Sequence, residues 1–327
     1  MTDDVILQVK DLKTYFKLDE GLLKAVDGVS FDLRKGETLG IVGESGSGKS
    51  VTNLAIMRLI PSPPGRIAGG EVLFMDKDIL KMNDEEVRKI RGNKISMIFQ
   101  DPMTCLNPFM RISTQMVETI VLHQGLDKVA AKEKAIEMLK LAGIPAPEKR
   151  IDQYPHQFSG GMRQRVMIAM ALSCEPEILI ADEPTTALDV TIQAQILELI
   201  RDLSVRLGTA VILVTHSLGV VAGMCDSICV MYAGRVVERG TADEIFTDPR
   251  HPYTQGLIKS VPRLDRANTQ RLYSIPGQPP NVINLPDCCP FFPRCERAMD
   301  VCKTKYPKVV ELGPKRNVAC WLYGEGK

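Results

Sequence analysis

The sequence predicts an α/β fold with parallel strands. Three observations lead to this prediction. Short apolar runs typical of strands alternate with segments of helical periodicity along much of the 327 residues, as in βαβ units. A Gly- and Ser-rich loop stands between an apolar strand at 38–42 and a helical run that begins near Lys49. The run 178–181 is entirely apolar and is followed by two acids, a pattern typical of a parallel strand that is covered on both faces.

The other elements follow from periodicity and from turn residues. Between Gln100 and Ser159 apolar residues recur at helical spacing, which indicates an inserted group of helices. Gly208 is well placed to end the helix that precedes it. From about Asp248, Pro and Cys residues break any long periodicity. The expected strands are 6–9, 29–33, 38–42, 70–74, 178–181, 210–214, 228–232 and 235–238, with a tight turn at 75–78, a helix over 192–207 and another helix from Leu218.

The Gly- and Ser-rich loop has the residues of a phosphate-binding loop. They are Gly43, Glu44, Ser45, Gly46, Ser47, Gly48, Lys49 and Ser50, which match the pattern G-x-x-x-x-G-K-[S/T]. Such a loop turns backbone N–H groups inward at a helix N-terminus, where the helix dipole also favours an anion. We expect Lys49 to reach the β- and γ-phosphates of ATP, and Ser50 to offer a hydroxyl ligand to Mg²⁺.

Two neighbouring carboxylates end the buried strand at 178–181. Asp182 suits an outer-shell role toward Mg²⁺, and Glu183 is placed to polarise the attacking water. Two adjacent acids by themselves are commonly no more than a solvated strand end. The phosphate loop upstream favours the functional interpretation.

These motifs, in this order, resemble the ATPase subunit of an ABC transporter, and the resemblance covers nearly the whole chain. It implies that Phe16 stacks on adenine, with the adjacent Tyr15 as the competing aromatic. It also implies that Gln100 contacts Mg²⁺ and the water, and that His216 contacts the γ-phosphate. The segment Ala187-Leu188-Asp189 resembles the D-loop of the family.

The segment Ser159-Gly160-Gly161 resembles the family's signature motif. It opens a helix, so its amides form a second anion site that the chain's own phosphate loop does not need. The resemblance implies that this site caps the γ-phosphate of ATP held by the opposite subunit of a head-to-tail dimer. Met162 stands where the general family pattern has Gln, as in the dipeptide and oligopeptide importer branch.

The resemblance also implies a division of the chain. It predicts a RecA-like nucleotide-binding core with an antiparallel β subdomain over 1–100 and 173–247. A helical subdomain carrying the signature motif is expected over 101–172, and a small cysteine-rich extension over 248–327. The implied partners are a second, homologous ATPase subunit, two transmembrane permease subunits and, indirectly, an extracytoplasmic substrate-binding protein.

Charge and hydropathy exclude some other classes of protein. The formal net charge is +1, which argues against nucleic acid as a partner, because binding that depends on phosphate neutralisation shows a basic surplus. No apolar run approaches the roughly 20 residues that span a bilayer. The first four residues carry acids where a secretion signal carries basic residues. We therefore expect a peripheral subunit on the cytoplasmic face of the cell membrane.

Cysteine is concentrated near the C-terminus. Five of the nine cysteines lie at 288, 289, 295, 302 and 320. We interpret the other four, Cys105, Cys174, Cys225 and Cys229, as packing residues. Disulfides are disfavoured in a chain that otherwise reads as a cytosolic ATPase. The four thiolates of Cys289, Cys295, Cys302 and Cys320 suit a [4Fe-4S] cluster or tetrahedral zinc, and their chemistry leaves this choice open.

The resemblance decides between these two metals. The run C-P-F-x-P-R-C followed by two further cysteines resembles the iron-sulfur motif of the peptide-importer branch, which favours the [4Fe-4S] cluster. Cys288 stands where the branch often carries Gly, so Cys289 is taken as the ligand. We expect the cluster to act as a structural staple for a segment that is poor in apolar residues.

Three other classes of protein use the same cassette. A DNA-repair ATPase would carry a long coiled coil or DNA-binding insertion between Gln100 and Ser159, and a ribosome-associated ABC factor would carry two cassettes. A binding-only subunit would have a degenerate site, whereas Lys49 and Glu183 are intact. The prediction is therefore an ATP-hydrolysing subunit for import of dipeptides or oligopeptides, with nickel chelates or small metabolites as the alternative cargo.

Overall fold

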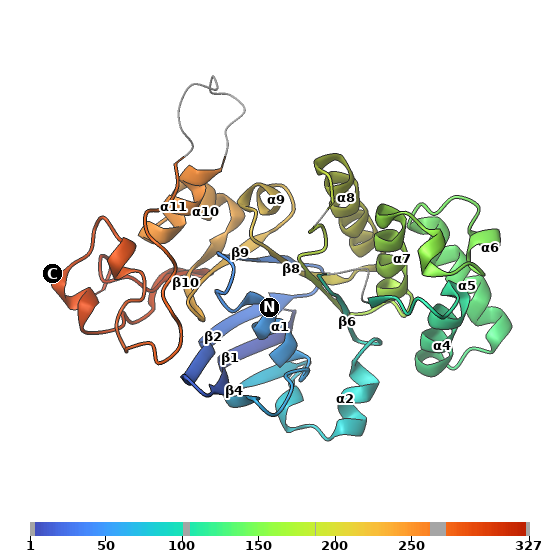
Figure 1. Cartoon of the computed structure of the whole chain (residues 1–327), viewed down its shortest axis with the longest axis horizontal. Coiled ribbons are helices and arrows are strands. Elements are labelled where there is room, and N and C mark those ends of the chain that lie inside the picture. The colour runs from blue at the N-terminus through green and yellow to red at the C-terminus, as the bar shows by residue number, and fades with distance from the viewer. Residues whose placement is uncertain (1–3, 101–104, 187, 262–272, 325–327) are drawn as a thin grey trace. The chain divides into compact units, whose positions relative to one another are not determined.

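The structure of the chain is a computed structural model, which describes residues 4–100, 105–186, 188–261 and 273–324. These residues form two compact units. The first unit holds Arg34–Glu37 and Lys81–Val214, and the second holds Val5–Leu33, Thr38–Leu80 and the described residues from Thr215 onward. No helix in the described part of the chain has the length and apolar character needed to cross a membrane. Each unit is described by itself below (Figure 1).

A four-stranded sheet in the second unit has the order β2-β1-β4-β5. Strand β1 pairs antiparallel with β4, and β4 with β5, as expected for the β subdomain. Met75 and Asp76 have positive φ values of 46° and 64°, which form the tight turn expected between these strands. The strands are longer than periodicity predicted. Their bounds are β1 (Val5–Leu18), β2 (Gly21–Arg34), β4 (Gly65–Phe74) and β5 (Lys77–Asp78).

The second unit also holds strands of a mixed sheet. Strand β3 pairs parallel with β9, β9 pairs antiparallel with β10, and β10 continues to β12 and β11. The last two strands come from the C-terminal extension, where the sequence predicted no strand. The bounds are β3 (Thr38–Val42), β9 (Ser227–Tyr232), β10 (Arg235–Thr241), β11 (Val310–Gly313) and β12 (Arg316–Val318).

Short helices complete the second unit. The longest, α11, begins at a proline, which is favourable at the first helical position because its missing N–H has no partner there anyway. The helices are α1 (Lys49–Ile56), α9 (Leu218–Ala222), α10 (Ala242–Thr247) and α11 (Pro252–Ser260), with 3₁₀ turns at η3 (Phe292–Arg294) and η4 (Asp300–Lys303). A further 3₁₀ turn, η1 (Ile79–Lys81), lies where the segment Thr38–Leu80 of the second unit ends.

The first unit combines three parallel strands with most of the long helices. Strand β7 (Ile178–Asp182) pairs with β6 (Ile95–Ile98) on one side and β8 (Ala210–Thr215) on the other. Every residue of β7 is buried, as the continuous apolar run predicted. The helices are α2 (Asp84–Ile90), α4 (Ile112–Gln124), α5 (Lys128–Leu141), α6 (Pro147–Arg150), α7 (Gly160–Leu172) and α8 (Val190–Leu207), with a 3₁₀ turn at η2 (Pro155–Gln157).

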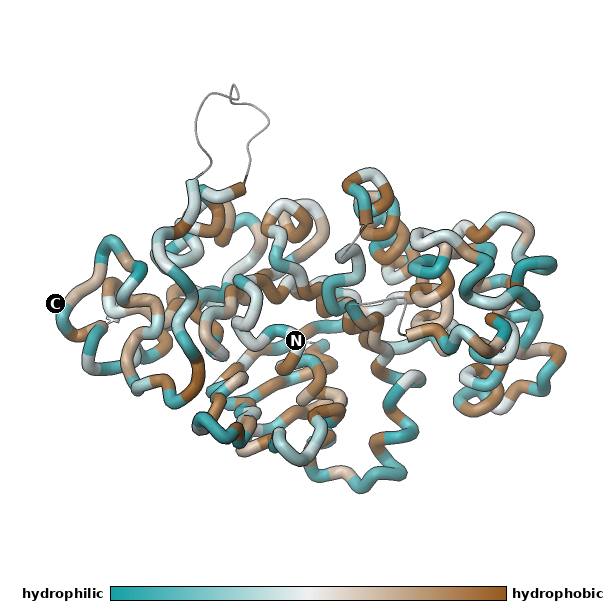
Figure 2. Tube along the Cα trace, in the orientation of Figure 1, coloured by the Kyte–Doolittle hydropathy of each residue, from teal (hydrophilic) through white to brown (hydrophobic). Residues whose placement is uncertain are grey.

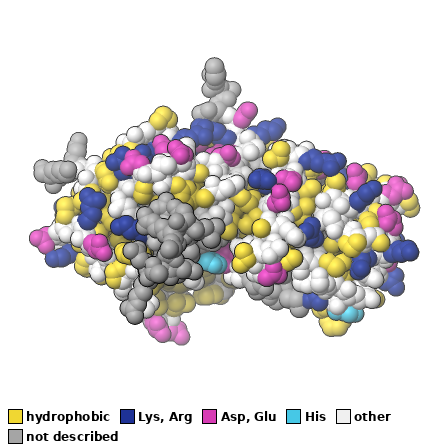
Figure 3. Space-filling model, turned by 90° about the horizontal axis from the view of Figure 1, so that it is seen from above, with side chains coloured by type: hydrophobic (Ala, Val, Ile, Leu, Met, Phe, Trp, Pro, Cys, Tyr) yellow, Lys and Arg dark blue, Asp and Glu magenta, His cyan; other side chains and the backbone are white. Residues whose placement is uncertain are grey.

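Helix ends in the first unit agree with their capping residues. Asn83 and Glu86 form a capping box at α2, and Asp127 accepts two backbone N–H bonds at the start of α5. Gly208 adopts φ 69° after α8, which confirms the predicted helix stop. Figure 2 shows hydrophobic residues (brown) along the strands. On the face shown in Figure 3, basic and acidic side chains lie interspersed over the described residues.

Candidate functional site

The phosphate loop in the second unit requires glycine at two positions. Gly43 has φ 155° and Gly48 has φ 99°. A Cβ atom on Gly43 would lie 2.2 Å from the Met231 carbonyl oxygen, and one on Gly48 would lie 2.3 Å from that of Ala25. Both clashes are with backbone atoms, so no side chain is accommodated there without moving a strand. The glycines therefore let the loop pass close to its neighbours and enter α1 at Lys49.

Lys49 turns back over the loop. Its ammonium group donates to the carbonyl oxygens of Gly43 at 2.8 Å and Glu44 at 3.0 Å. The side chain is buried, and it lies at the first turn of α1, beside Ser50. Thr52 donates its hydroxyl to the Gly48 carbonyl oxygen at 2.9 Å, which secures the junction of loop and helix. A cation at a helix N-terminus within a loop of turned amides is an arrangement that binds phosphate.

The Asp-Glu pair lies in the first unit at the end of β7. Asp182 is buried, and Glu183 follows with φ 47°, a conformation uncommon for residues other than glycine. The Glu183 carboxylate accepts from the Gln100 side-chain amide at 3.1 Å and from the Thr186 hydroxyl at 3.0 Å. The structure thus brings together two predicted site residues that are 83 positions apart in sequence. The donors hold the carboxylate in one orientation.

The signature segment is the exposed start of α7. Ser159 is the N-cap, and its hydroxyl accepts from the Met162 N–H at 3.4 Å. A Cβ on Gly160 would meet open space, whereas one on Gly161 would come within 3.2 Å of Ile192. Ser159 and Gly160 are exposed and Gly161 half-exposed. Backbone N–H groups at this helix start are therefore accessible from outside the chain.

Gln164, inside α7, connects this helix to the segment that follows β7. Its side-chain amide donates to the carbonyl oxygen of Pro184, which directly follows Glu183. Asp189 caps α8 by accepting from the Ile192 N–H at 3.0 Å. Ala187, the first residue of the predicted D-loop, lies outside the described residues. Capping accounts for the position of Asp189 in this chain, so its role toward nucleotide stays a prediction.

The two candidate aromatics of β1 differ in their surroundings. The Tyr15 hydroxyl donates to Asp27 at 2.6 Å, and burial together with this bond raises the pKa of Tyr15 to about 12. Phe16 is half-exposed and opposite Gly65 on β4, where a Cβ would lie 2.7 Å from its ring. Phe16 thus has an apolar ring face lying over a residue without a side chain, whereas Tyr15 serves a polar contact.

The structure assigns the predicted site residues to separate units. The phosphate loop, Phe16 and His216 belong to the second unit, in which His216 is exposed after β8. Gln100, Ser159, Gly160, Gly161, Asp182, Glu183 and Asp189 belong to the first unit.

The four predicted metal-ligating cysteines line a single cavity in the extension. They share it with aromatic residues, including Phe291 and Trp321. Cys289, Cys295, Cys302 and Cys320 all belong to this lining, and the Cys289 N–H donates to the Cys302 carbonyl oxygen at 3.0 Å. Burial raises the pKa of Cys289 to about 12 and that of Cys320 to about 11. In the part of the chain that the structure describes, no three His, Cys, Asp or Glu side chains form a group able to hold a metal ion.

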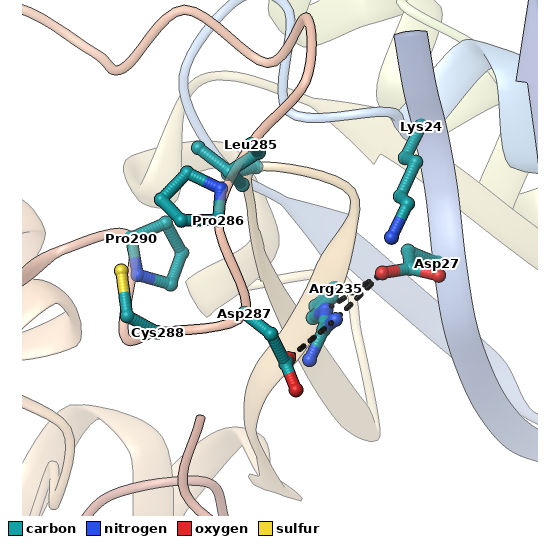
Figure 4. Close-up of a pocket in the computed structure, with 9 residues that line it drawn as sticks. Lys24, Asp27, Arg235, Leu285, Pro286, Asp287, Cys288 and Pro290 are labelled. Carbon is teal, nitrogen blue, oxygen red and sulfur yellow. Dashed lines mark hydrogen bonds and ion pairs between the residues drawn. The ribbon is translucent and has the colours of Figure 1, made fainter. Parts of the chain in front are cut away.

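Cys288 faces a different cavity, shown in Figure 4, which is lined also by Lys24, Asp27 and Arg235. Cys288 is therefore apart from the cavity that Cys289 lines with the other three cysteines, and the choice of Cys289 as a ligand stays a prediction. Among the four cysteines interpreted as packing residues, Cys174, Cys225 and Cys229 are buried. The prediction was wrong for Cys105, which is exposed.

Sequence reasoning did not single out two residues that contact the phosphate loop. Tyr253 and Arg294 both reach Glu44 from the C-terminal extension. Tyr253 belongs to the sequence His251-Pro252-Tyr253-Thr254, and Arg294 stands directly before Cys295. The available signals in the sequence were an arginine and a tyrosine within a segment of irregular periodicity. These signals do not indicate which residues the two side chains contact.

Comparisons with known proteins identify the family that this chain matches. Residues 26–186 match the family "ABC transporter", and residues 237–302 match "Oligopeptide/dipeptide transporter, C-terminal region". The chain is 54% identical to the oligopeptide transport ATP-binding protein OppD of Bacillus subtilis, over 97% of this chain and 88% of that protein. It is 53% identical to the dipeptide transport ATP-binding protein DppD of the same organism and 52% identical to OppD of Escherichia coli, with 94% and 93% of those proteins covered and 97% of this chain in each case.

Solved structures give the same result. The dimeric post-hydrolysis structure of the ATP-binding cassette MJ0796 bound to ADP and Pi matches with a TM-score of 0.64 and 30% identity, over 72% of this chain and 98% of that one. The structure of cbiO1 from Clostridium perfringens matches with a TM-score of 0.63 and 29% identity, over 75% of this chain and 92% of that one. The predicted ABC-type α/β fold is thereby confirmed. The chain belongs to the family of ABC transporter ATP-binding proteins that includes these oligopeptide and dipeptide transport proteins.

Proposed function

We propose that this chain is the ATP-hydrolysing subunit of a transporter that imports dipeptides or oligopeptides. The observation that carries the proposal is the combined match to the cassette and to the C-terminal region of peptide transporters, together with relatives above 50% identity that are named for peptide transport. The intact phosphate loop and the oriented Glu183 carboxylate support a hydrolytic rather than a binding-only subunit.

The chemistry is transfer of the γ-phosphoryl group of ATP to water. Backbone N–H groups of the phosphate loop and the Lys49 ammonium bind and orient the β- and γ-phosphates, while Phe16 holds the adenine by stacking. Ser50, Gln100 and Asp182 would hold Mg²⁺, which supplies charge neutralisation on the phosphates when bound. Glu183 accepts a hydrogen bond from the attacking water and polarises it.

The hydrogen bonds to Glu183 serve this role. The Gln100 amide and the Thr186 hydroxyl both donate to the carboxylate, so the carboxylate cannot rotate freely. Its remaining lone pairs therefore point in fixed directions. His216 contacts the γ-phosphate in this proposal. The bond broken is the one between the γ-phosphorus and the bridging oxygen, and ADP and inorganic phosphate leave.

A second cassette completes the site. The exposed amides of Ser159, Gly160 and Gly161 offer an anion site that the chain's own loop does not use, so we assign it, with Asp189, to the ATP of a homologous partner. ATP binding then closes a head-to-tail dimer, and hydrolysis reopens it. Two permease subunits and a substrate-binding protein complete the transporter, with this subunit on the cytoplasmic face of the membrane and 101–172 as its helical subdomain.

Turnover tests the first part of the proposal. Glu183→Gln keeps the shape of the side chain but removes its basic oxygen, so nucleotide binding is retained and phosphate release falls. Near-normal hydrolysis would assign the positioning of water to another residue. Cargo is tested by uptake of labelled dipeptides, longer peptides and nickel in cells that lack the gene, complemented with the wild type or with Lys49→Ala. Nickel uptake without peptide uptake would favour the alternative cargo.

We propose further that Cys289, Cys295, Cys302 and Cys320 hold a [4Fe-4S] cluster, with zinc as the alternative. What supports it is that four thiols from one segment line a single cavity, which is the donor set that either centre requires. Iron, acid-labile sulfide and zinc are measured per chain after anaerobic purification. Iron and sulfide near four each support the cluster, zinc alone supports the alternative, and absence of all three refutes both.

A further inference from the structure

Glu44 of the phosphate loop is held from outside the loop by the C-terminal extension. Its carboxylate accepts two hydrogen bonds from Arg294, at 2.7 and 2.9 Å. Its backbone N–H donates to the Tyr253 hydroxyl at 2.8 Å. Both the side chain and the main chain of one loop residue are therefore bonded to residues more than 200 positions away in sequence.

The contact with Arg294 is not a solvated surface pair. The Arg294 side chain is 5% exposed and that of Glu44 26% exposed. Two parallel N–H···O bonds fix the relative orientation of guanidinium and carboxylate, whereas a lysine would provide only a point charge. The arrangement thus restrains the direction of the loop at Glu44 as well as its distance from the extension.

Arg294 is itself rigidly supported. Its Nε donates to the Pro276 carbonyl oxygen at 3.0 Å, and its guanidinium donates to the Tyr232 hydroxyl at 3.2 Å. The ring of Phe291 packs against Tyr232 and Tyr253, with centroids 5.3 and 5.4 Å apart. This aromatic group joins the extension to β9, which lies beside the strand that leads into the phosphate loop.

The position of Arg294 in the chain connects it with the cysteine cavity. It ends the 3₁₀ turn Phe292–Arg294, between Cys289 and Cys295, and its N–H donates to the Phe291 carbonyl oxygen at 3.0 Å. A rearrangement of the backbone between Cys289 and Cys295 would therefore displace the backbone of Arg294, from which the guanidinium reaches Glu44.

We propose that Arg294 is a positioning residue for ATP binding, through which the fold of the cysteine-rich extension sets the conformation of the phosphate loop. The inference rests on the phosphate-binding role proposed above for the loop. If Arg294 has this role, nucleotide affinity and the order of the extension depend on the same conformational equilibrium. Linkage requires the effect to be reciprocal: nucleotide binding must stabilise the segment around Arg294.

The test is a double-mutant cycle on the full chain. Arg294→Met, Glu44→Gln and the double variant are titrated with Mg-ADP and Mg-ATPγS by calorimetry. We expect each single variant to bind about tenfold more weakly, a factor typical of coupled sites, and the double variant to be no weaker than either single one. Arg316→Met is the matched control, because Arg316 is a largely buried arginine of the same extension that bonds to Asp248 instead.

The reciprocal effect provides an independent readout. Amide hydrogen exchange of residues 291–295 is expected to slow when Mg-ATPγS binds the wild type or the Arg316→Met variant, and to respond much less in Arg294→Met at equal saturation. If Arg294 had a merely structural role, Arg316→Met and Arg294→Met would lose nucleotide affinity to the same extent. The losses in the double-mutant cycle would then be additive.

The outcomes separate this inference from the assignment of the loop. Unchanged affinity in Arg294→Met, equal losses in Arg294→Met and Arg316→Met, or additive losses in the cycle would each overturn the role of Arg294. Lys49→Ala is titrated in parallel. If Lys49→Ala binds nucleotide as the wild type does, the phosphate-loop assignment itself fails. If it loses binding while Arg294→Met does not, only the positioning role fails.

Discussion

Arg235 is the centre of a second connection between the extension and the β subdomain, and its replacement by Met is expected to destabilise the second unit. Its guanidinium bonds to Asp27 at 2.6 and 3.2 Å, lies 3.6 Å from Asp287 and covers the ring of Tyr306 at 3.9 Å (Figure 4 shows the acids). The side chains of Arg235 and Asp27 are 22% and 11% exposed. This pair is therefore mostly shielded from solvent.

The expected loss is about 3 kcal/mol. Removing one partner of a buried ion pair costs about 3–5 kcal/mol, and the low end applies because Asp27 keeps its bond from Tyr15. The contact with Tyr306 adds about 1 kcal/mol. The Met side chain recovers about 1 kcal/mol by remaining in apolar contact. Asp27→Asn combined with Arg235→Met is expected to lose less than the two single variants together.

Urea denaturation followed by tryptophan fluorescence measures this loss. The chain has one tryptophan, Trp321, which lies in the extension and donates to the Lys305 carbonyl oxygen at 3.1 Å. Lys303→Met is the control, because the pair between Lys303 and Asp300 is exposed and its loss should leave the transition unchanged. A loss below about 1 kcal/mol for Arg235→Met at an unchanged denaturant slope would refute the reasoning.

Three further predictions concern hydrolysis, pH and the cysteines. Glu183→Gln is expected to lower phosphate release by at least about 100-fold with nucleotide affinity retained, as measured by a phosphate assay and calorimetry; a smaller drop contradicts the assigned role. Burial raises the pKa of Asp27, but hydrogen bonds from Tyr15 and Arg235 outweigh it and leave the pKa below its usual range. Asp27 therefore contributes stability above about pH 4 that is lost as pH falls through the lower, folded-state pKa, so the difference in urea midpoint between wild type and Asp27→Asn should shrink on acidification; a constant difference contradicts this. Cys295→Ser is expected to lower the metal content of the purified chain and Cys288→Ala to leave it unchanged, as elemental analysis will show; equal losses would place Cys288 at the metal.

Local patterns predicted much of the fold and of the candidate site. The run before Asp182 is apolar at every position, and a strand with no polar face is buried on both sides wherever it lies. The phosphate loop was recognisable because its glycines serve local backbone geometry, as the positive φ values of 77° at Gly46 and 99° at Gly48 show. The stop at Gly208 follows from the same local property.

Other features depended on contacts between segments distant in sequence. Strands β11 and β12 have too few residues for a period to be visible, and they are defined by pairing with β10. Which residue of an adjacent aromatic or cysteine pair serves which contact depended on the direction of the side chains. Tyr15 turns to Asp27 while Phe16 lies over Gly65, and Cys288 faces a different cavity from Cys289.

The sequence by itself determined the kind of chemistry. The phosphate loop, the buried strand that ends in acids and the N-capped start of α7 at Gly160-Gly161 each consist of consecutive residues. Only the tertiary structure decided how the extension is joined to that chemistry. The bond between Glu44 and Arg294 spans 250 positions. Neither residue lies in a periodic pattern that would name the other, since a long-range ion pair is defined by the packing of the elements that carry it.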